Sequence, residues 1–241
     1  MQTTLRHQRL QPVQINLMRA YWIFCVVFLS GCANNNALFL KAAKTAIGKL
    51  KPSETVVLDP AYRYMRVTVG KQNVYMVLAS RDRTPQGLLD TWYSGEAEVI
   101  KLMAGRIVST YGLPTDWRAV RSATIPSWKS VLKSSRVYSR QRDVMPGYHY
   151  GLEDRITMQA IMPPKRTSLI NKRPNQLVWF EEKTATQYKG EKIPTAIYAI
   201  DFSNHKERVV YSVQCLNSKL CLAFQEVGNE PTKTMRGAKS L

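Results

Sequence analysis

Histidine and cysteine, on which many catalytic and metal sites depend, are rare in this sequence. There are 3 histidines and 4 cysteines among 241 residues, and neither His149 nor His205 stands at ligand spacing from a cysteine. A G-x-S-x-G nucleophile elbow and a glycine-rich phosphate-binding loop are also missing. These shortages exclude a recognisable zinc or nucleotide site. We therefore predict that the chain has no cofactor and is not an enzyme.

Acidic residues are the second shortage, with 17 Asp and Glu against 35 Lys and Arg and a net charge of +18. A field of that sign favours anionic partners such as lipid head groups or acidic polysaccharide. The basic residues are scattered in ones and twos rather than gathered into a dense patch, so we expect no nucleic-acid partner. A solvated basic surface without a specific partner is the simpler alternative.

The N-terminal region also lacks an apolar run long enough to cross a membrane. Its apolar segment, residues 20–29, has about ten residues, whereas a membrane helix needs about 20. The segment ends in Leu29-Ser30-Gly31-Cys32, which matches the bacterial lipoprotein signal, the lipobox, at every position. We predict a signal peptide over residues 1–31, with Met18 as the better start, and lipidation of Cys32. The alternative is an ordinary buried strand or helix that ends in Gly-Cys.

The lipobox also predicts where the protein works. In proteins with this signal the cysteine carries diacylglycerol and a further acyl chain such as palmitate, and two or more chains anchor a protein stably in a bilayer. Ala33 stands where an aspartate would commonly indicate retention in the inner membrane. We therefore expect a lipid anchor in the outer membrane of a Gram-negative cell, with the protein facing the periplasm.

The remaining chain, residues 32–227, is predicted to be a single β-rich domain, with an N-terminal tether and a short helix at residues 37–50. Alternating apolar residues and short turns predict antiparallel meander sheets, because short loops cannot make parallel crossovers. These sheets would form a sandwich or a half-open barrel. Residues 112–135 are expected to hold at most a short helix near 127–133, and residues 228–241 a flexible tail. The expected strands are residues 61–69, 74–79, 89–94, 97–103, 106–111, 136–142, 148–161, 176–188, 195–202, 207–214 and 220–227.

Cys215 and Cys221 are the two cysteines that remain after the signal peptide and the anchor. Their C-x5-C spacing fits a disulfide at the end of a hairpin in an oxidising compartment. Two buried thiols are the alternative.

Carboxylate pairs and aromatic side chains are the remaining candidates for chemistry. Glu153-Asp154 and Glu181-Glu182 are adjacent residues in predicted strands, so the two members of each pair point to opposite faces. We interpret them as surface charges rather than as the paired carboxylates of a glycosidase. Large aromatic rings can stack on sugars but more commonly pack in a core. We favour core packing for the aromatic residues Trp92, Tyr93, Trp117, Trp128, Tyr148 and Tyr150.

A block between residues 62 and 117 carries a family resemblance. It reads Tyr64-Met65-Arg66-Val67, Val77-Leu78-Ala79, Trp92-Tyr93-Ser94, Gly105-Arg106-Ile107-Val108 and Tyr111-Gly112-Leu113-Pro114-Thr115-Asp116. In order, in spacing and in the preceding lipobox, it resembles the group 4 capsule polysaccharide lipoproteins known as GfcB and YjbF. The resemblance implies a mainly β outer-membrane lipoprotein and supplies no catalytic or ligand residue. We take six residues of the block as a candidate interaction surface: Trp92, Tyr93, Ser94, Gly105, Arg106 and Gly112.

These observations together predict a non-enzymatic accessory factor in the assembly or export of capsule or exopolysaccharide. Its partners would be the membrane, through the N-terminal lipid, and also anionic polysaccharide and polysaccharide-secretion proteins. A half-barrel that binds lipid or glycolipid is the alternative from another class of function. A glycan-modifying enzyme is a third.

Overall fold

The computed structural model describes residues 58–203 and 207–227 of the chain. Four features expected from the sequence lie outside these residues: the signal peptide, the lipidation site Cys32, the helix at 37–50 and the tail at 228–241.

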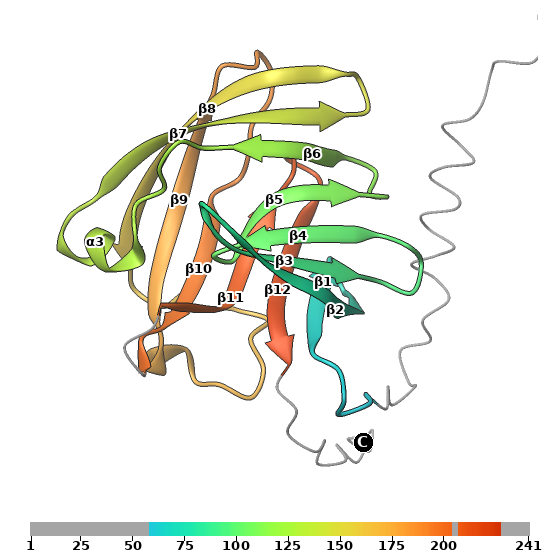
Figure 1. Ribbon diagram of the computed structural model, residues 1–241. Helices are drawn as coiled ribbons and strands as arrows, with labels where there is room; N and C mark the ends of the chain where they lie inside the picture. Colours follow the sequence, from blue (N-terminus) through green and yellow to red (C-terminus); the bar gives the residue numbers. More distant parts are fainter. Residues whose placement is uncertain (1–57, 204–206, 228–241) are drawn as a thin grey trace, which may run out of the picture. The chain divides into compact units, whose positions relative to one another are not determined.

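The described residues form one antiparallel sheet of 12 strands (Figure 1). Its order is β5-β4-β3-β2-β1-β12-β11-β10-β9-β8-β7-β6. Strands that follow one another in the chain therefore pair, except β5 and β6, and β1 also pairs with β12. The predicted meander and mainly β fold are therefore confirmed. The strands are β1 (Tyr64–Val69), β2 (Gln72–Thr84), β3 (Gly87–Tyr93), β4 (Val99–Met103), β5 (Arg106–Tyr111), β6 (Asp116–Arg121), β7 (Arg136–Met145), β8 (His149–Ile161), β9 (Val178–Thr186), β10 (Ala196–Asp201), β11 (Arg208–Cys215) and β12 (Cys221–Val227).

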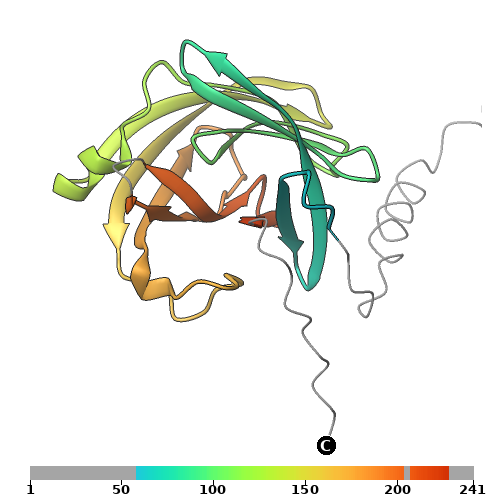
Figure 2. The same ribbon diagram turned by 60° about the horizontal axis from the view of Figure 1, so that its bottom comes forward.

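The pairing of β1 with β12 curls the sheet into a nearly closed barrel (Figure 2). The two edges of the sheet, β5 and β6, are consecutive in the chain and are joined by side chains. The Thr110 hydroxyl donates to Asp116 Oδ1 (2.9 Å) and accepts from Trp117 N (3.0 Å). The buried Asp116 also accepts from the backbone amides of Gly112 and Leu113. A side-chain cluster thus closes the seam where a backbone ladder would otherwise run.

β6 was not expected from the sequence, which predicted no strand between residues 112 and 135. That prediction was wrong because β6 takes its backbone partners from β7 alone and shifts register between Trp117 and Ala119, which blurs the alternation. The short helix in the same stretch is confirmed as α3 (Trp128–Lys133). The Ser127 hydroxyl caps it, and the Glu207 carboxylate accepts from its first two backbone amides.

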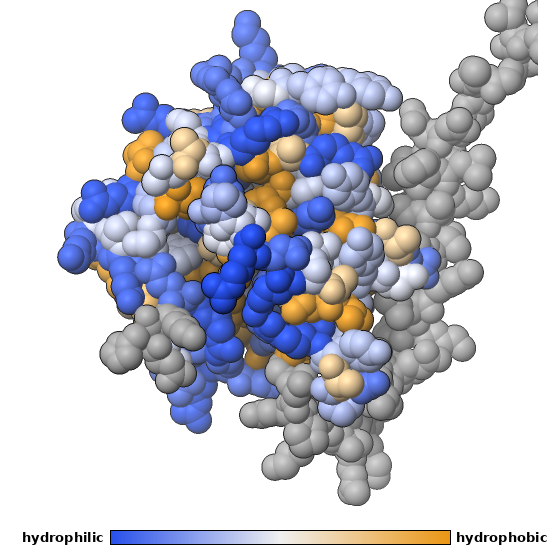
Figure 3. Space-filling view, in the orientation of Figure 1, coloured by the Kyte–Doolittle hydropathy of each residue, from blue (hydrophilic) through white to orange (hydrophobic). Residues whose placement is uncertain are grey.

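The inward-facing side chains fill the barrel with two apolar clusters. One includes Trp92, Trp117 and Phe224, and the other includes Trp128 and Phe180. In the space-filling view of Figure 3, hydrophobic side chains appear as separate patches between hydrophilic ones. Burial of this apolar surface supplies the main favourable term for folding.

A third cluster lies on the outside of the barrel, under the segment that links β8 to β9. This segment, residues 162–177, includes the short helix η2 (Pro174–Gln176), and we call it the strap. The strap covers Trp179 and Tyr211. It is held by hydrogen bonds from the Trp179 indole to Pro174 O (2.7 Å) and from Ile170 N to Gln225 Oε1 (3.0 Å). A loop with these contacts has a defined position on the sheet.

Cys215 and Cys221 are register partners at the turn between β11 and β12, and a disulfide joins them.

Candidate functional site

A polar groove of about 730 Å³ crosses strands β6 to β9. Its lining residues come from four separate parts of the chain, which the sheet brings side by side. The lining residues are Arg121, Ser122, Ala123, Ser139, Arg140, Gln141, Glu153, Asp154, Arg155, Ala185 and Gln187. Most of them are solvent-exposed, so the groove is open to a ligand larger than a small molecule.

The register of the strands arranges the exposed residues in two rows. In the first row Arg121 pairs with Gln141, and Gln141 with Glu153. The backbone amide of Gln187 continues this row by donating to Glu153 O. In the second row Ser139 pairs with Arg155, and Arg155 with Ala185. Because alternate residues of a strand share a face, the rows run side by side across the strands.

The two rows present donors and acceptors suited to a hydroxylated ligand. Arg121 and Arg155 donate, Glu153 accepts, and the Gln141 amide does both. The small side chains of Ser139 and Ala185 leave room in the second row. Arg–carboxylate hydrogen bonds are charge-assisted, so the two arginines also suit an acidic group on the ligand.

Arg121 at the rim of the groove is held by Asp143, which is buried. The hydrogen bond from Arg121 and a second from Gly151 N lower the pKa of the Asp143 carboxyl. The same ion pair raises the pKa of Arg121. Asp143 therefore remains ionised and positions the guanidinium without entering the groove lining.

A buried ionic cluster lies behind the groove, inside the barrel. Arg140 Nε and Arg142 Nε both donate to Asp154 Oδ2, at 2.9 and 2.7 Å. Both guanidinium groups stack over the ring of Trp117, and Arg142 also pairs with Glu191. The Asp154 side chain is fully buried. Two arginines thus hold this carboxylate inside the barrel.

A second buried cluster links opposite walls of the barrel. Arg106 Nε of β5 donates to Glu182 Oε1 of β9 (2.8 Å), and the Tyr198 hydroxyl donates to Glu182 Oε2 (3.0 Å). The Arg106 guanidinium lies 3.9 Å from the centroid of the Trp128 ring. Burial and the charge of Glu182 raise the pKa of Tyr198, so its hydroxyl stays protonated. Burial opposes the charge on Arg106, but the adjacent Glu182 raises the pKa of this arginine.

These clusters correct the interpretation of the acidic pairs as surface charges. Glu153 is exposed and Glu181 is half-buried, but Asp154 and Glu182 are each 2% exposed. The prediction that adjacent members point to opposite faces is right. The inward members are buried because arginines on neighbouring or facing strands neutralise them.

Most of the described sheet falls within a stretch that matches a known protein family. Residues 40–213 match the family model described as group 4 capsule polysaccharide lipoprotein GfcB, YjbF. The chain belongs to this family. No curated protein matches the chain, and among the described residues no helix has the length and apolar character to span a membrane.

The fold is also similar to that of a solved lipoprotein structure. The crystal structure of the hypothetical lipoprotein YmcC from Escherichia coli (K12) matches with a TM-score of 0.54 and 15% identity. The match covers 78% of this chain and 97% of that one. At this identity the likeness concerns the fold alone.

The residues that carry the capsule-lipoprotein resemblance do not form one surface. Trp92 is 2% and Arg106 is 6% exposed, which corrects their placement in a candidate interaction surface. Gly105 has a φ of +78° and packs against Val209. A Cβ atom on residue 105 would lie 2.5 Å from the Val209 side chain. Tyr93 is exposed, whereas Ser94 bonds locally to Glu98. The block is therefore mainly structural, because its turn at Gly105 and its tryptophan pack in the barrel.

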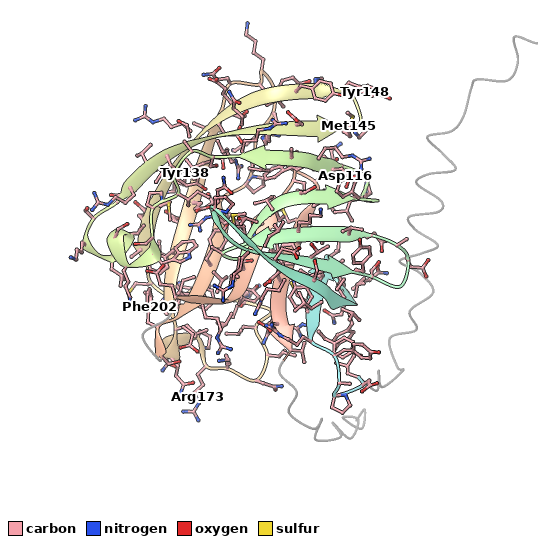
Figure 4. The ribbon with its side chains drawn as sticks, viewed as in Figure 1. Asp116, Tyr138, Met145, Tyr148, Arg173 and Phe202 are labelled. Atoms are coloured by element: carbon pink, nitrogen blue, oxygen red, sulfur yellow. A yellow bond between two sulfur atoms is a disulfide. The ribbon has the colours of Figure 1, made fainter. Side chains whose placement is uncertain are left out.

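Gly112, the sixth residue of this block, lies at the seam with φ +88°, a conformation that favours glycine. Its backbone amide donates to Asp116. Asp116 is the first residue of β6 (Figure 4). This glycine therefore turns the chain between the two edge strands.

The other aromatic candidates divide between core and surface. Trp117 and Trp128 are buried, as core packing predicts. Tyr148 and Tyr150 are 74% and 63% exposed, so core packing was wrong for them. Tyr148 lies by the turn between β7 and β8, at the end of that hairpin (Figure 4). None of these four residues lines the groove.

The groove residues were missed because nothing marks them in the sequence as a set. Arg121, Gln141, Arg155 and Gln187 are ordinary surface residue types at strand positions. The available signal was indirect. Every second residue of β7 reads Tyr138, Arg140, Arg142 and Val144, so the two arginines lie between two apolar residues on one strand face. Charges at inward positions can indicate a buried ionic cluster, and here that cluster backs the groove.

Proposed function

We propose that this protein is a non-enzymatic accessory factor for the assembly or export of capsule or exopolysaccharide, anchored in the outer membrane and facing the periplasm. The observation that carries the proposal is membership of the capsule polysaccharide lipoprotein family over residues 40–213. The lipobox at Leu29-Ser30-Gly31-Cys32 supports the anchor and the compartment.

We assign contact with the polysaccharide to the polar groove. From Arg121 on β6 to Gln187 after β9 it crosses three strand spacings of about 4.8 Å, or about 14 Å in all. That length suits a segment of an extended sugar chain rather than a single sugar. The rows of Arg, Gln, Glu and Ser side chains can exchange hydrogen bonds with sugar hydroxyls, and Arg121 and Arg155 can pair with uronic-acid or other acidic groups.

The groove chemistry favours binding over catalysis. Hydrolysis of a glycosidic bond needs two carboxyl groups on either side of the scissile bond, one of them able to donate a proton. Of the two carboxylates that line the groove, Glu153 is exposed and Asp154 is engaged by two arginines. The two are adjacent residues of β8 and face opposite sides of the sheet, so they do not flank one bound sugar.

The packing of the barrel argues against the lipid-carrier alternative. Groups from opposite walls meet inside it: Arg106 with Glu182, Ile107 N with the Gln214 side chain, and the Trp117 indole with Leu216 O. An acyl chain would have to displace these contacts. We therefore place the ligand on the outside of the sheet.

Deletion of the gene and measurement of cell-surface polysaccharide test the function. We expect the polymer load to fall and to return when the wild-type gene is supplied. Complementation with Arg121→Ser/Arg155→Ser should restore less polymer than the wild type, while Lys71→Ser should restore it fully. Lys71 is a suitable control because it is an exposed basic residue between β1 and β2 and does not line the groove. An unchanged polymer load after deletion refutes the proposal, and full rescue by the double variant refutes the role of the groove.

A further inference from the structure

One end of the barrel carries many exposed basic residues. We call the end where β1 begins at Tyr64 and β12 ends at Val227 the tether end, because the described chain begins there (Figures 1 and 2). The strap, α3, the β2–β3 turn and the start of β11 lie at the same end, since the strands alternate in direction. Eight basic residues at this end are exposed: Arg83, Lys133, Arg136, Lys165, Arg166, Lys172, Arg173 and Arg208.

The described residues of the tether end include fewer carboxylates than exposed basic residues: Asp59, Asp82, Asp201, Glu207 and Glu226. Asp201 pairs with Arg208 and lies 3.8 Å from Lys172. Glu207 is engaged at the start of α3. No carboxylate of the described chain forms an ion pair with Lys165, Arg166 or Arg173. The strap therefore presents net positive charge to its surroundings.

The strap holds this charge in a defined place. Besides its contacts with Trp179 and Gln225, the Ser168 side chain bonds to the Tyr211 hydroxyl (3.0 Å), and Arg66 donates to Ser168 O. Arg173 points away from the barrel at its tether end (Figure 4). Because the backbone is fixed to the sheet, binding through these side chains costs less ordering entropy than binding through a free loop.

A lipid anchor at Cys32 would keep the described barrel near a bilayer. Residues 33–57 are 25 residues long and can span at most about 90 Å when fully extended. A lipid on Cys32 would hold the strap within that distance of the head groups but would not orient it. Each basic residue near an anionic surface then strengthens binding about fivefold, and the tether makes the contact intramolecular.

We propose that the tether end docks on anionic lipid head groups through the strap, with Lys165, Arg166, Lys172 and Arg173 as the main contacts. This docking turns the opposite end of the barrel, with the disulfide-closed turn between β11 and β12, away from the membrane. The inference rests on the membrane location in the proposed function but not on polysaccharide binding.

The test uses the full chain with Cys32→Ser, so that binding comes from the protein surface and not from the acyl chains. Co-flotation is measured with phosphatidylcholine vesicles, with and without about 30% phosphatidylglycerol, at low and high salt. The strap variant carries Lys165→Gln, Arg166→Gln, Lys172→Gln and Arg173→Gln. The control carries Lys71→Gln, Lys189→Gln, Lys192→Gln and Lys219→Gln, four exposed lysines at the opposite end. Both variants keep residues 33–57, so any contribution of that segment is equal in the two.

We expect binding only to the anionic vesicles, at low salt, with a loss of more than tenfold in the strap variant and less than twofold in the control. Equal losses in the two variants, unchanged binding in the strap variant, or equal binding to neutral vesicles would overturn the proposal. So would a strap variant that keeps vesicle binding but loses binding to an acidic polysaccharide such as polygalacturonate. Polymer load after gene deletion is a separate measurement, so docking and the proposed function can fail independently.

Discussion

The Arg106–Glu182 pair allows a quantitative test of the barrel interior. Its side chains are 7% and 2% exposed and their Nε–Oε1 distance is 2.8 Å. Glu182→Gln keeps the shape of the side chain and an oxygen that can accept from Tyr198, but it leaves the Arg106 charge unpaired inside the protein. Breaking a buried ion pair in this way costs about 3–5 kcal/mol. We expect a loss near the lower limit, about 3 kcal/mol, because the guanidinium keeps its contact with the Trp128 ring.

A loss of that size is a large part of the total stability of a typical domain, which is about 5–15 kcal/mol. For a domain of this length it corresponds to a fall in Tm of about 6–12 °C. Equilibrium unfolding in urea, followed by tryptophan fluorescence, measures it directly because Trp92, Trp117, Trp128 and Trp179 are all buried.

The matched controls separate charge burial from general damage. Arg106→Met/Glu182→Met removes both charges and should lie within about 1.5 kcal/mol of the wild type, since apolar replacements of buried ion pairs are often neutral. Glu153→Gln changes an exposed carboxylate and should cost less than about 0.5 kcal/mol. A loss below 1 kcal/mol in Glu182→Gln, or a double variant as unstable as the sum of its single variants, would refute the reasoning.

Three further predictions concern the anchor, the disulfide and the response to pH. Cys32→Ser should abolish palmitate labelling and release the protein from membranes in cell fractionation at high salt; persistent membrane association there would contradict the anchor. Reduction of Cys215–Cys221, which are six residues apart, should lower the free energy of unfolding by about 2 kcal/mol by the loop-entropy estimate; an unchanged Tm under reducing conditions would disprove this. Hydrogen bonds from Arg121 and, second, from Gly151 lower the pKa of Asp143. Hydrogen bonds from Ser203 are the main cause of the lowered pKa of Asp201. Their stabilisation is thus present above the unfolded-state pKa of about 4 and is lost as the pH falls toward the folded-state values. Asp143→Asn should therefore lower stability at pH 6 and flatten its decline between pH 5 and 3 in urea titrations, and parallel wild-type and variant curves would count against this assignment.

Local patterns were enough to predict the meander and most of its strands. Short turns between alternating segments, such as Ala104-Gly105 between β4 and β5, leave antiparallel pairing as the available arrangement. β6 was missed because it is an edge strand with a register shift. The surface role given to Trp92 and Arg106 was wrong because a motif shows which residues recur together and not which way they face.

The amino-acid sequence by itself determined the β class, the order of the strands along the chain, the spacing of Cys215 and Cys221, and the lipobox that predicts export. All of these depend on residues close together in the chain. The tertiary structure alone decided that β1 pairs with β12, that Glu182 neutralises Arg106, and that segments from β6 to β9 share one groove. An inward carboxylate and a surface carboxylate occupy equivalent alternating positions in a strand, so only the partner that folding brings to it shows whether its charge is buried.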